Sequence, residues 1–278
     1  MQLTALAWNL FHGRDFPPDP GLRSWRSRLL RFDERNETHV QVNRDLTAEF
    51  ATVLAGARWD VALLQETPPR FAAPLARACG AESHRALTSR NSLGPLRALL
   101  ARQNPDLMAS GEGGSNLTLV RVPGRLGGIA ERRELEIHGG FPERRSMALT
   151  RTASGLCIAN LHATNDRPEM AADDVLRAAR AAVEFAAGAP LIFGGDLNLR
   201  PAEDPLVFER LREDFDLTGP TGPKAIDHLL VRDLEVLEPP TQWPPERREL
   251  PFEGRALRLS DHAPLEATFA ARDRAELR

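Results

Sequence analysis

Polar residues that could bind a metal ion or a phosphate group follow several apolar stretches of this sequence. They occur in six short segments, Trp8-Asn9, Gln65-Glu66-Thr67, Asn160-Leu161-His162, Gly194-Gly195-Asp196-Leu197-Asn198, Ile226-Asp227-His228 and Ser260-Asp261-His262. A buried polar side chain without a hydrogen-bond partner costs about 1–3 kcal/mol, so such side chains beside buried strands need partners. If they converge at one edge of the fold, they form a natural site for a hard cation and a phosphate.

The residue types fit metal-assisted hydrolysis of a phosphate ester. Magnesium prefers oxygen ligands, which Glu66 and Asn9 can supply. Asp196 can orient or deprotonate the attacking water. Asp227 and His262 could form a carboxylate–imidazole pair that stabilises the phosphoryl group or transfers a proton. A divalent cation, Mg²⁺ or Mn²⁺, is the expected cofactor.

Each segment taken alone also has a structural explanation. Asn9 could simply end a strand with a turn. Asp196 and Asn198 could be turn residues before a helix, and His162 could be a hydrogen-bonded residue at a strand end. The occurrence of all the segments in one chain favours the functional interpretation.

The remaining histidines are interpreted as structural. His228 follows Asp227 directly, so its side chain should point to the opposite face of the strand. His12, His39, His84 and His138 have no obvious partner in the sequence and are expected to be surface or loop residues.

The elements that must position these residues are typical of the α/β class, because short apolar runs alternate with longer helical patterns. Strands are predicted at 3–9, 61–65, 116–121, 146–151, 156–162, 191–194, 225–231 and 264–269. Helices are predicted at 41–56, 71–79, 93–102, 169–187 and 204–212, of which 169–187 is rich in alanine. Segments 12–38 and 238–257 contain several prolines and are predicted to be long irregular loops.

Composition limits the class of protein. The chain has 278 residues, of which 42% are hydrophobic and 27% charged, as in an ordinary globular protein. No internal repeat or linker is evident, so a single domain is predicted over 1–271, followed by a charged tail at 272–278. The net charge of −3 gives no general attraction to nucleic acid.

Cysteine content and the absence of targeting signals suggest a location. Cys79 and Cys157 are too few for a disulfide framework and are expected to be buried free thiols. No apolar run approaches the roughly 18 residues of a membrane helix, and the N-terminus lacks the pattern of a secretion signal. A cytoplasmic location is therefore expected, with no membrane contact and no obligate protein partner.

In this order, the six segments resemble those of the endonuclease/exonuclease/phosphatase superfamily, which includes DNase I-like nucleases, apurinic endonucleases, neutral sphingomyelinases and inositol polyphosphate phosphatases. The resemblance runs from Ala5 to Phe269. The motif Gly-Asp-x-Asn at 195–198 and the motif Ser-Asp-His at 260–262 are each moderately specific for this superfamily. All six segments in this order are a strong indication of it. The resemblance implies a four-layer α/β/β/α sandwich of two mixed sheets, with the site at one end.

The resemblance also implies a role for each site residue. Glu66 would be the main metal ligand, Asn9 a metal or phosphate contact, and Asp261 would lie at the metal side. His162 would contact the phosphate, and Asp227 would orient His262. The implied residues are, for catalysis, His162, Asp196, Asn198, Asp227 and His262; for phosphate or substrate, Asn116 and Arg145; and for the metal, Asn9, Glu66 and Asp261.

The substrate is less well defined. The chain contains no tyrosine, which disfavours the apurinic endonucleases, and it lacks the Trp-Cys-Asp-Arg motif of inositol phosphatases. Arginine-rich stretches at 23–35 and 247–258 favour a phosphodiesterase that acts on DNA or RNA. A phosphomonoesterase acting on a small metabolite, or a non-catalytic binding module on the same fold, are the alternatives.

Overall fold

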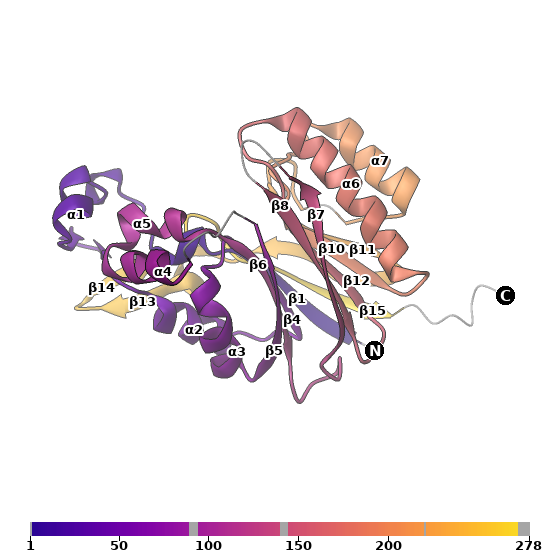
Figure 1. The fold of residues 1–278 in the computed structure, drawn as a ribbon, viewed down its shortest axis with the longest axis horizontal. Helices are drawn as coiled ribbons and strands as arrows, with labels where there is room; N and C mark the ends of the chain where they lie inside the picture. The colour runs from indigo at the N-terminus through magenta and orange to yellow at the C-terminus, as the bar shows by residue number, and fades with distance from the viewer. Residues whose placement is uncertain (1, 89–93, 140–143, 220, 272–278) are drawn as a thin grey trace.

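Two mixed β-sheets form the centre of the molecule, which is described here from a computed structural model (Figure 1). The structure describes residues 2–88, 94–139, 144–219 and 221–271. The first sheet has the strand order β12 (Leu234–Gln242), β15 (Leu265–Ala271), β1 (Gln2–Asn9), β4 (Val61–Gln65), β6 (Ser115–Arg121), β5 (Ala81–Leu87). The second has the order β11 (Asp227–Arg232), β10 (Leu191–Asp196), β9 (Cys157–His162), β8 (Arg145–Thr152), β7 (Ile129–His138).

The two sheets pack face to face, because the buried strands alternate their side chains between two apolar layers. In β1, Leu3, Ala5 and Ala7 point into the layer between the sheets, where they join residues such as Ile158 and Ile192 of the second sheet. The intervening positions of β1 point to the outer layer that the helices cover. Each sheet is therefore buried on both faces at its centre.

Helices cover the outer faces of both sheets. On the second sheet lie α6 (Pro168–Ala186) and α7 (Pro205–Phe215), and on the first lie α2 (Thr47–Gly56) and α3 (Ala72–Cys79) (Figure 1). The helix α6 begins with a proline in its first turn, where no backbone hydrogen bond is lost. The predicted four-layer α/β/β/α sandwich is confirmed.

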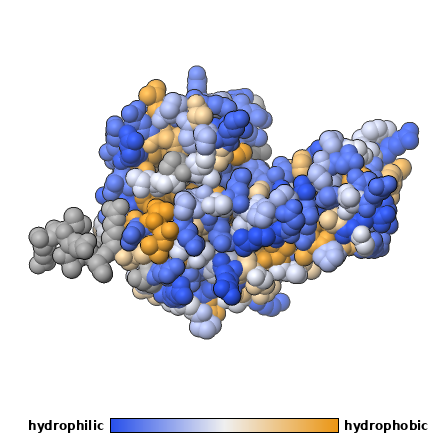
Figure 2. Space-filling model, turned by 180° about the vertical axis from the view of Figure 1, so that it is seen from behind, coloured by the Kyte–Doolittle hydropathy of each residue, from blue (hydrophilic) through white to orange (hydrophobic). Residues whose placement is uncertain are grey.

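A smaller lobe extends from one end of the sandwich (Figures 1 and 2). It contains a four-stranded sheet and three helices. The face of the whole molecule seen from behind in Figure 2 is mostly hydrophilic, with separate apolar patches. Its strands are β13 (Glu249–Phe252), β14 (Arg255–Arg258), β3 (His39–Gln41) and β2 (Glu34–Arg35). Its helices are α1 (Trp25–Leu30), α4 (Gly94–Gln103) and α5 (Pro105–Glu112). Short 3₁₀ helices span Phe11–Gly13, Pro20–Leu22, Pro69–Phe71 and Pro245–Arg248.

The prediction that segments 12–38 and 238–257 are long irregular loops is wrong. Segment 238–257 is not irregular, because it contains the end of β12 and the β13–β14 hairpin. The prolines are tolerated since β12 is an edge strand whose register shifts between Val236 and Glu238 and again before Thr241. Segment 12–38 contains α1 and β2, and the helix predicted from residue 41 begins at Thr47.

Besides β12 and the small-lobe elements α1, α5, β2, β3, β13 and β14, two strands of the main sheets were not predicted from the sequence: β5 and β7. The two strands lie at the edges of their sheets, and β7 is largely solvent-exposed, so neither has an uninterrupted apolar run.

Cys79 and Cys157 are buried free thiols, as expected. No helix in the described part of the chain combines the length and apolar character needed to cross a bilayer. The predicted tail at 272–278 lies outside the described residues.

Candidate active site

Strand register brings the polar segments together at one end of the sandwich. The parallel strands β1 and β4 end side by side, with Asn9 opposite Gln65. In the second sheet, Asp196 at the end of β10 lies between His162 of β9 and Asp227 of β11. The strand ends therefore converge because parallel strands finish at the same edge and the antiparallel strand β11 begins there.

The two sheets are joined at this edge by a buried hydrogen bond. Gln65 Nε2 donates to Asn160 Oδ1 at 2.7 Å. Gly195 allows this close approach, because a Cβ atom there would lie 2.1 Å from the carbonyl oxygen of Leu161 and 2.9 Å from Gln65 Nε2. The glycine also has a φ of +122°, which other residues rarely adopt.

Asp227 and His262 form a direct pair. Asp227 Oδ2 lies 2.8 Å from His262 Nδ1, and His262 Nε2 lies 3.8 Å from Asp196 Oδ2. Burial alone would lower the pKa of His262, but Asp227, Asp196 and Asp261 outweigh it and raise the pKa to about 10. The imidazolium is thus the form that this pair stabilises.

Asp196 is the central carboxylate of the site and is almost fully buried. Burial, followed by repulsion from Asp227, raises the pKa of Asp196 to about 7. Asn9 Nδ2 donates to Asp196 Oδ2 at 2.9 Å, and the backbone N–H of Asn198 donates to Asp196 Oδ1 at 3.1 Å. Two fixed donors therefore set the orientation of a carboxyl group that titrates near neutral pH.

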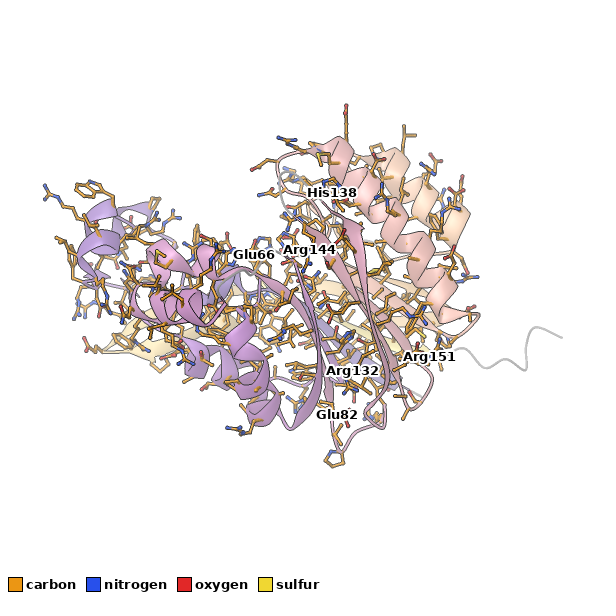
Figure 3. All side chains as sticks on the ribbon, viewed as in Figure 1. Glu66, Glu82, Arg132, His138, Arg144 and Arg151 are labelled. Carbon is orange, nitrogen blue, oxygen red and sulfur yellow. The ribbon has the colours of Figure 1, made fainter. Side chains whose placement is uncertain are left out.

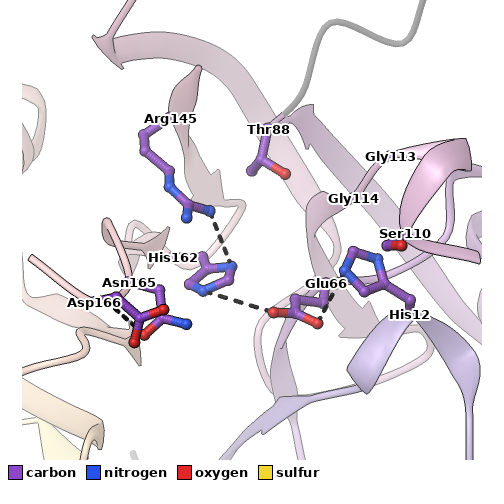
Figure 4. Close-up of a pocket in the computed structure, with 10 residues that line it drawn as sticks. All are labelled: His12, Glu66, Thr88, Ser110, Gly113, Gly114, Arg145, His162, Asn165 and Asp166. Carbon is purple, nitrogen blue, oxygen red and sulfur yellow. Dashed lines mark hydrogen bonds and ion pairs between the residues drawn. The ribbon is translucent and has the colours of Figure 1, made fainter. Parts of the chain in front are cut away.

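A second cluster surrounds Glu66 (Figure 4). Glu66 Oε1 lies 3.9 Å from His162 Nε2, and Glu66 Oε2 lies 3.2 Å from His12 Nε2. Arg145 Nη1 lies 3.4 Å from His162 Nδ1. Burial, with the positive charge of Arg145 adding to it, lowers the pKa of His162 well below its ordinary value. His162 is therefore neutral, and it connects the two clusters because its Nε2 is also 3.6 Å from Asp196 Oδ2.

Glu66 and Arg144 both lie at the end of the sandwich that faces the small lobe, whereas Glu82 and Arg132 lie toward the opposite end (Figure 3). The latter two form an exposed ion pair at 3.2 Å. The polar residues of the site are thus separate from the ordinary charged surface of the sheets.

The predicted site residues do not all line the cleft. Asn116 is fully buried, and its side-chain amide donates to the carbonyl oxygen of Ser146 at 2.8 Å. Asp261 is at the rim, where its Oδ1 lies 4.0 Å from His262 Nε2. Asn198 Nδ2 donates to the carbonyl oxygen of Ala163 at 3.1 Å. Six of the predicted residues therefore line cavities at the site, namely Glu66, Arg145, His162, Asp227, Asp261 and His262. Asn9 and Asn198 are hydrogen-bonded to the buried Asp196, and Asn116 is buried away from these cavities.

Two cavities are lined by residues of the site. The first, of about 290 Å³, is lined by Glu66, Arg145 and His162. The second, of about 850 Å³, is lined by Asp227, Asp261 and His262, and also by basic residues, Arg200, Lys224 and Arg248. Asp196 lies within 4 Å of one histidine from each cavity, at 3.6 and 3.8 Å.

Several residues of the site were missed or misread in the sequence. His12 was expected to be a loop residue without a partner, but it faces Glu66. Arg248 belongs to the arginine-rich stretch 247–258 that favoured a nucleic-acid substrate, but it is buried and donates to the carbonyl oxygen of His262 at 2.9 Å. The position of His12 just after the strand that ends at Asn9 could have indicated its place. His228 is buried and contacts Leu199, as a structural residue should.

The donor set is chemically suited to a hard divalent cation. Glu66 directs both of its oxygens toward the cleft. Asp196, Asp227 and His262 form a further group of potential ligands whose atoms lie within 4.8 Å of one another. Asp227 Oδ1 is buried and accepts no hydrogen bond from the described residues. A bound cation would give this oxygen the partner that it lacks among the described residues.

Comparison with known sequences identifies the family. The chain belongs to the Endonuclease/Exonuclease/phosphatase family, whose model matches residues 6–262. Members of this family are hydrolases that act on phosphate esters, so the chain is a phosphoesterase by family. No curated protein sequence matches it.

Solved structures share the fold at low sequence identity. An endonuclease/exonuclease/phosphatase family protein from Bacteroides thetaiotaomicron is 12% identical with a TM-score of 0.66, covering 98% of this chain and 96% of that one. A mannosyl-6-phosphatase from the same organism is 13% identical, with a TM-score of 0.62 and coverage of 96% and 99%. The catalytic domain of human Nocturnin is 14% identical, with a TM-score of 0.60 and coverage of 97% and 93%. At these identities the similarity shows the fold alone.

Proposed function

We propose that this protein is a divalent-cation-dependent phosphodiesterase, with nucleic acid as the favoured substrate. The observation that carries the proposal is the grouping of four carboxylates with imidazoles and Arg145 at one end of the sandwich, beside two cavities. The carboxylates are those of Glu66, Asp196, Asp227 and Asp261.

Charge supports the need for a cation. A phosphodiester is an anion, and bringing it to a site rich in carboxylates is unfavourable unless positive charge is supplied. Arg145 and the imidazolium of His262 supply part of it. A divalent cation, Mg²⁺ or Mn²⁺, held by Glu66 with Asn9 and Asp261 nearby, would supply the rest by neutralising charge on the phosphoryl oxygens.

The residues of this chain then have separate tasks. Asp196 orients the attacking water and accepts its proton, which suits a carboxyl group whose pKa is raised to about 7. Asn9 and Asn198 position Asp196 through the hydrogen bonds described above. His262, oriented by Asp227, and the His162–Arg145 pair stabilise the phosphoryl group.

The two cavities support a diester over a monoester. A diester carries two organic groups on the phosphorus atom, and Asp196 lies close to a histidine of each of the two cavities. Arg200 and Lys224 in the larger cavity suit a second phosphate of a polynucleotide. Among proteins with this fold, one is a mannosyl-6-phosphatase, so a phosphomonoester remains the second candidate.

A substrate panel tests the proposal. Single- and double-stranded DNA, RNA, bis(p-nitrophenyl) phosphate and p-nitrophenyl phosphate are assayed with Mg²⁺, with Mn²⁺ and with EDTA. We expect cation-dependent turnover that is higher on the diesters and is lost in the Asp196→Asn variant. Turnover of the monoester alone would favour the phosphatase, and no turnover with any substrate would favour a binding module.

A further inference from the structure

His12 is the histidine closest to Glu66 in the described structure, yet nothing in the proposed reaction uses it. Its Nε2 lies 3.2 Å from Glu66 Oε2, and both side chains line the smaller cavity. The exposed fractions of the side chains are 19% and 21%, so solvent and ions can reach both. Figure 4 shows His12 and His162 on opposite sides of the Glu66 carboxylate.

The backbone holds His12 in this place at a conformational cost. Phe11 and His12 have φ angles of 49° and 52°, in the left-handed region that non-glycine residues seldom adopt, and such residues cost about 1–3 kcal/mol each. The backbone N–H of Phe11 donates to Asn9 Oδ1 at 2.9 Å. Gly13 follows with a φ of 75°, and a Cβ atom there would lie 2.6 Å from the ring of Phe71. A strained, closely packed turn therefore presents the imidazole to Glu66.

We infer that His12 is a direct ligand of the divalent cation that Glu66 holds, and that the site therefore selects Mn²⁺ over Mg²⁺. This inference rests on the proposed function, because it assumes a cation at Glu66. The geometry fits, since two ligands about 2.1–2.2 Å from one ion and at right angles to each other lie about 3 Å apart. The observed separation of His12 Nε2 and Glu66 Oε2 is 3.2 Å.

The metal preference follows from the donor atoms. Magnesium binds oxygen ligands and usually keeps several waters. Imidazole nitrogen suits transition metals better, and the oxygen-rich remainder of the site suits Mn²⁺. A site with one nitrogen among carboxylate and amide oxygens should thus bind Mn²⁺ more tightly than Mg²⁺.

A simple ion pair between His12 and Glu66 makes the opposite prediction. In that case a protonated His12 would compete with the cation for Glu66, and removing the imidazole would tighten cation binding. The sign of the change in affinity therefore separates the two interpretations.

Calorimetric titration of the purified protein with MnCl₂ and with MgCl₂ tests the inference. We expect the His12→Ala variant to weaken Mn²⁺ binding at least about 10-fold and Mg²⁺ binding much less, so that the selectivity ratio falls. His12→Gln, which keeps a polar side chain of similar length, should also reduce the ratio, and it serves if the alanine variant does not fold. The electronic spectrum of bound Co²⁺ should change in either variant, because it reports the loss of a nitrogen ligand.

A matched control is present in the small lobe. His39 Nε2 lies 3.3 Å from Glu249 Oε1, with similarly buried side chains, but this pair does not line the smaller cavity. His39→Ala should leave both metal affinities unchanged.

The outcomes distinguish this inference from the proposed function. Unchanged or tighter Mn²⁺ binding in both His12 variants overturns the inference, whereas a loss of binding in Glu66→Gln still supports a cation at Glu66. If Glu66→Gln binds Mn²⁺ as wild type does, the proposed cation position itself is wrong, and the inference fails with it.

Discussion

The two halves of the site are built differently. In the strand half, His162, Asp196 and Asp227 end or begin strands of the second sheet, and their side chains are 6%, 3% and 3% exposed. In the loop half, the side chains of Glu66 and His262 are 21% and 16% exposed. Regular strands hold the first half, while the second depends on turns.

The difference separates two requirements of such a site. A buried carboxyl group beside a second carboxylate has its pKa raised, which the strand half provides for Asp196. Exchange of a cation and a substrate needs access to solvent, which the loop half provides. Glu66 and Ser260 have φ angles of 46° and 59°, so unusual backbone conformations direct the loop half toward the cleft.

The strand half should be the more sensitive to substitution. Asp196→Asn keeps the shape of the side chain but removes the base, and we expect kcat to fall about 10³-fold. Initial rates on the best substrate of the panel measure the effect. Asp214→Asn is the matched control, because Asp214 is an exposed residue of α7. A loss of less than about 10-fold in Asp196→Asn would contradict the assignment.

The Asp227–His262 pair joins the two halves, and its disruption should have the second-largest effect on kcat. Asp227→Asn should lower the pKa of His262, because its nearest negative charge is removed, and should reduce kcat about 10²-fold. In the wild type, the raised pKa of His262 contributes stability that is fully present below about 6.5 and is lost as pH rises toward 10. NMR titration of the imidazole and unfolding at pH 7 and 10 measure both effects. An unchanged pKa in Asp227→Asn would show that the pair does not act as described.

The hydrogen bond that joins the two sheets behind the halves should matter for stability rather than for chemistry. Gln65→Leu leaves Asn160 Oδ1 without its donor, and we expect unfolding free energy to fall by about 1–3 kcal/mol in urea titrations. Replacing Gln65 and Asn160 together by leucine should cost less than the sum of the two single changes, because neither Gln65 Nε2 nor Asn160 Oδ1 is then buried without the other. A double variant that loses the sum of both single losses would refute this explanation.

A buried histidine outside the site should show the smallest effect and the opposite pH dependence. Burial, with Arg132 adding to it, lowers the pKa of His84 to about 4. The neutral ring therefore contributes stability that is present above about 6.5 and is lost as pH falls toward 4. We expect the wild type to lose roughly 1–2 kcal/mol more than His84→Gln between pH 7.5 and pH 5, as measured by urea unfolding. Parallel pH profiles of the two proteins would contradict it.

The same contrast explains what the sequence could predict. Strand ends were found because an apolar run followed by Asp, Asn or His is visible locally, as at Asp196 and His162. His12 was missed, because its partner Glu66 follows a different strand and only the tertiary fold brings the two together. The edge strands β5 and β7 were missed since exposed edges lack an apolar run.

The placement of Asn116 illustrates the limit of a resemblance. The resemblance implied a phosphate or substrate contact for Asn116, and this residue does lie at the start of β6, two residues after Gly114 of the smaller cavity. Its side chain is nevertheless buried, and its amide donates to the carbonyl oxygen of Ser146 in the second sheet. Neither the hydrophobic periodicity of a sequence nor a short motif reveals which way the side chain at a strand end points. A role in substrate contact stays a prediction for Asn116.

The order of strands in the first sheet has a consequence for synthesis. The last strand, β15, lies between β12 and β1, so one edge of β1 stays uncovered until residues 265–271 have emerged. Asp261 and His262 immediately precede that strand. A nascent chain released early would therefore lack both a closed sheet and the imidazole opposite Asp227, so prematurely terminated copies are expected to be inert as hydrolases.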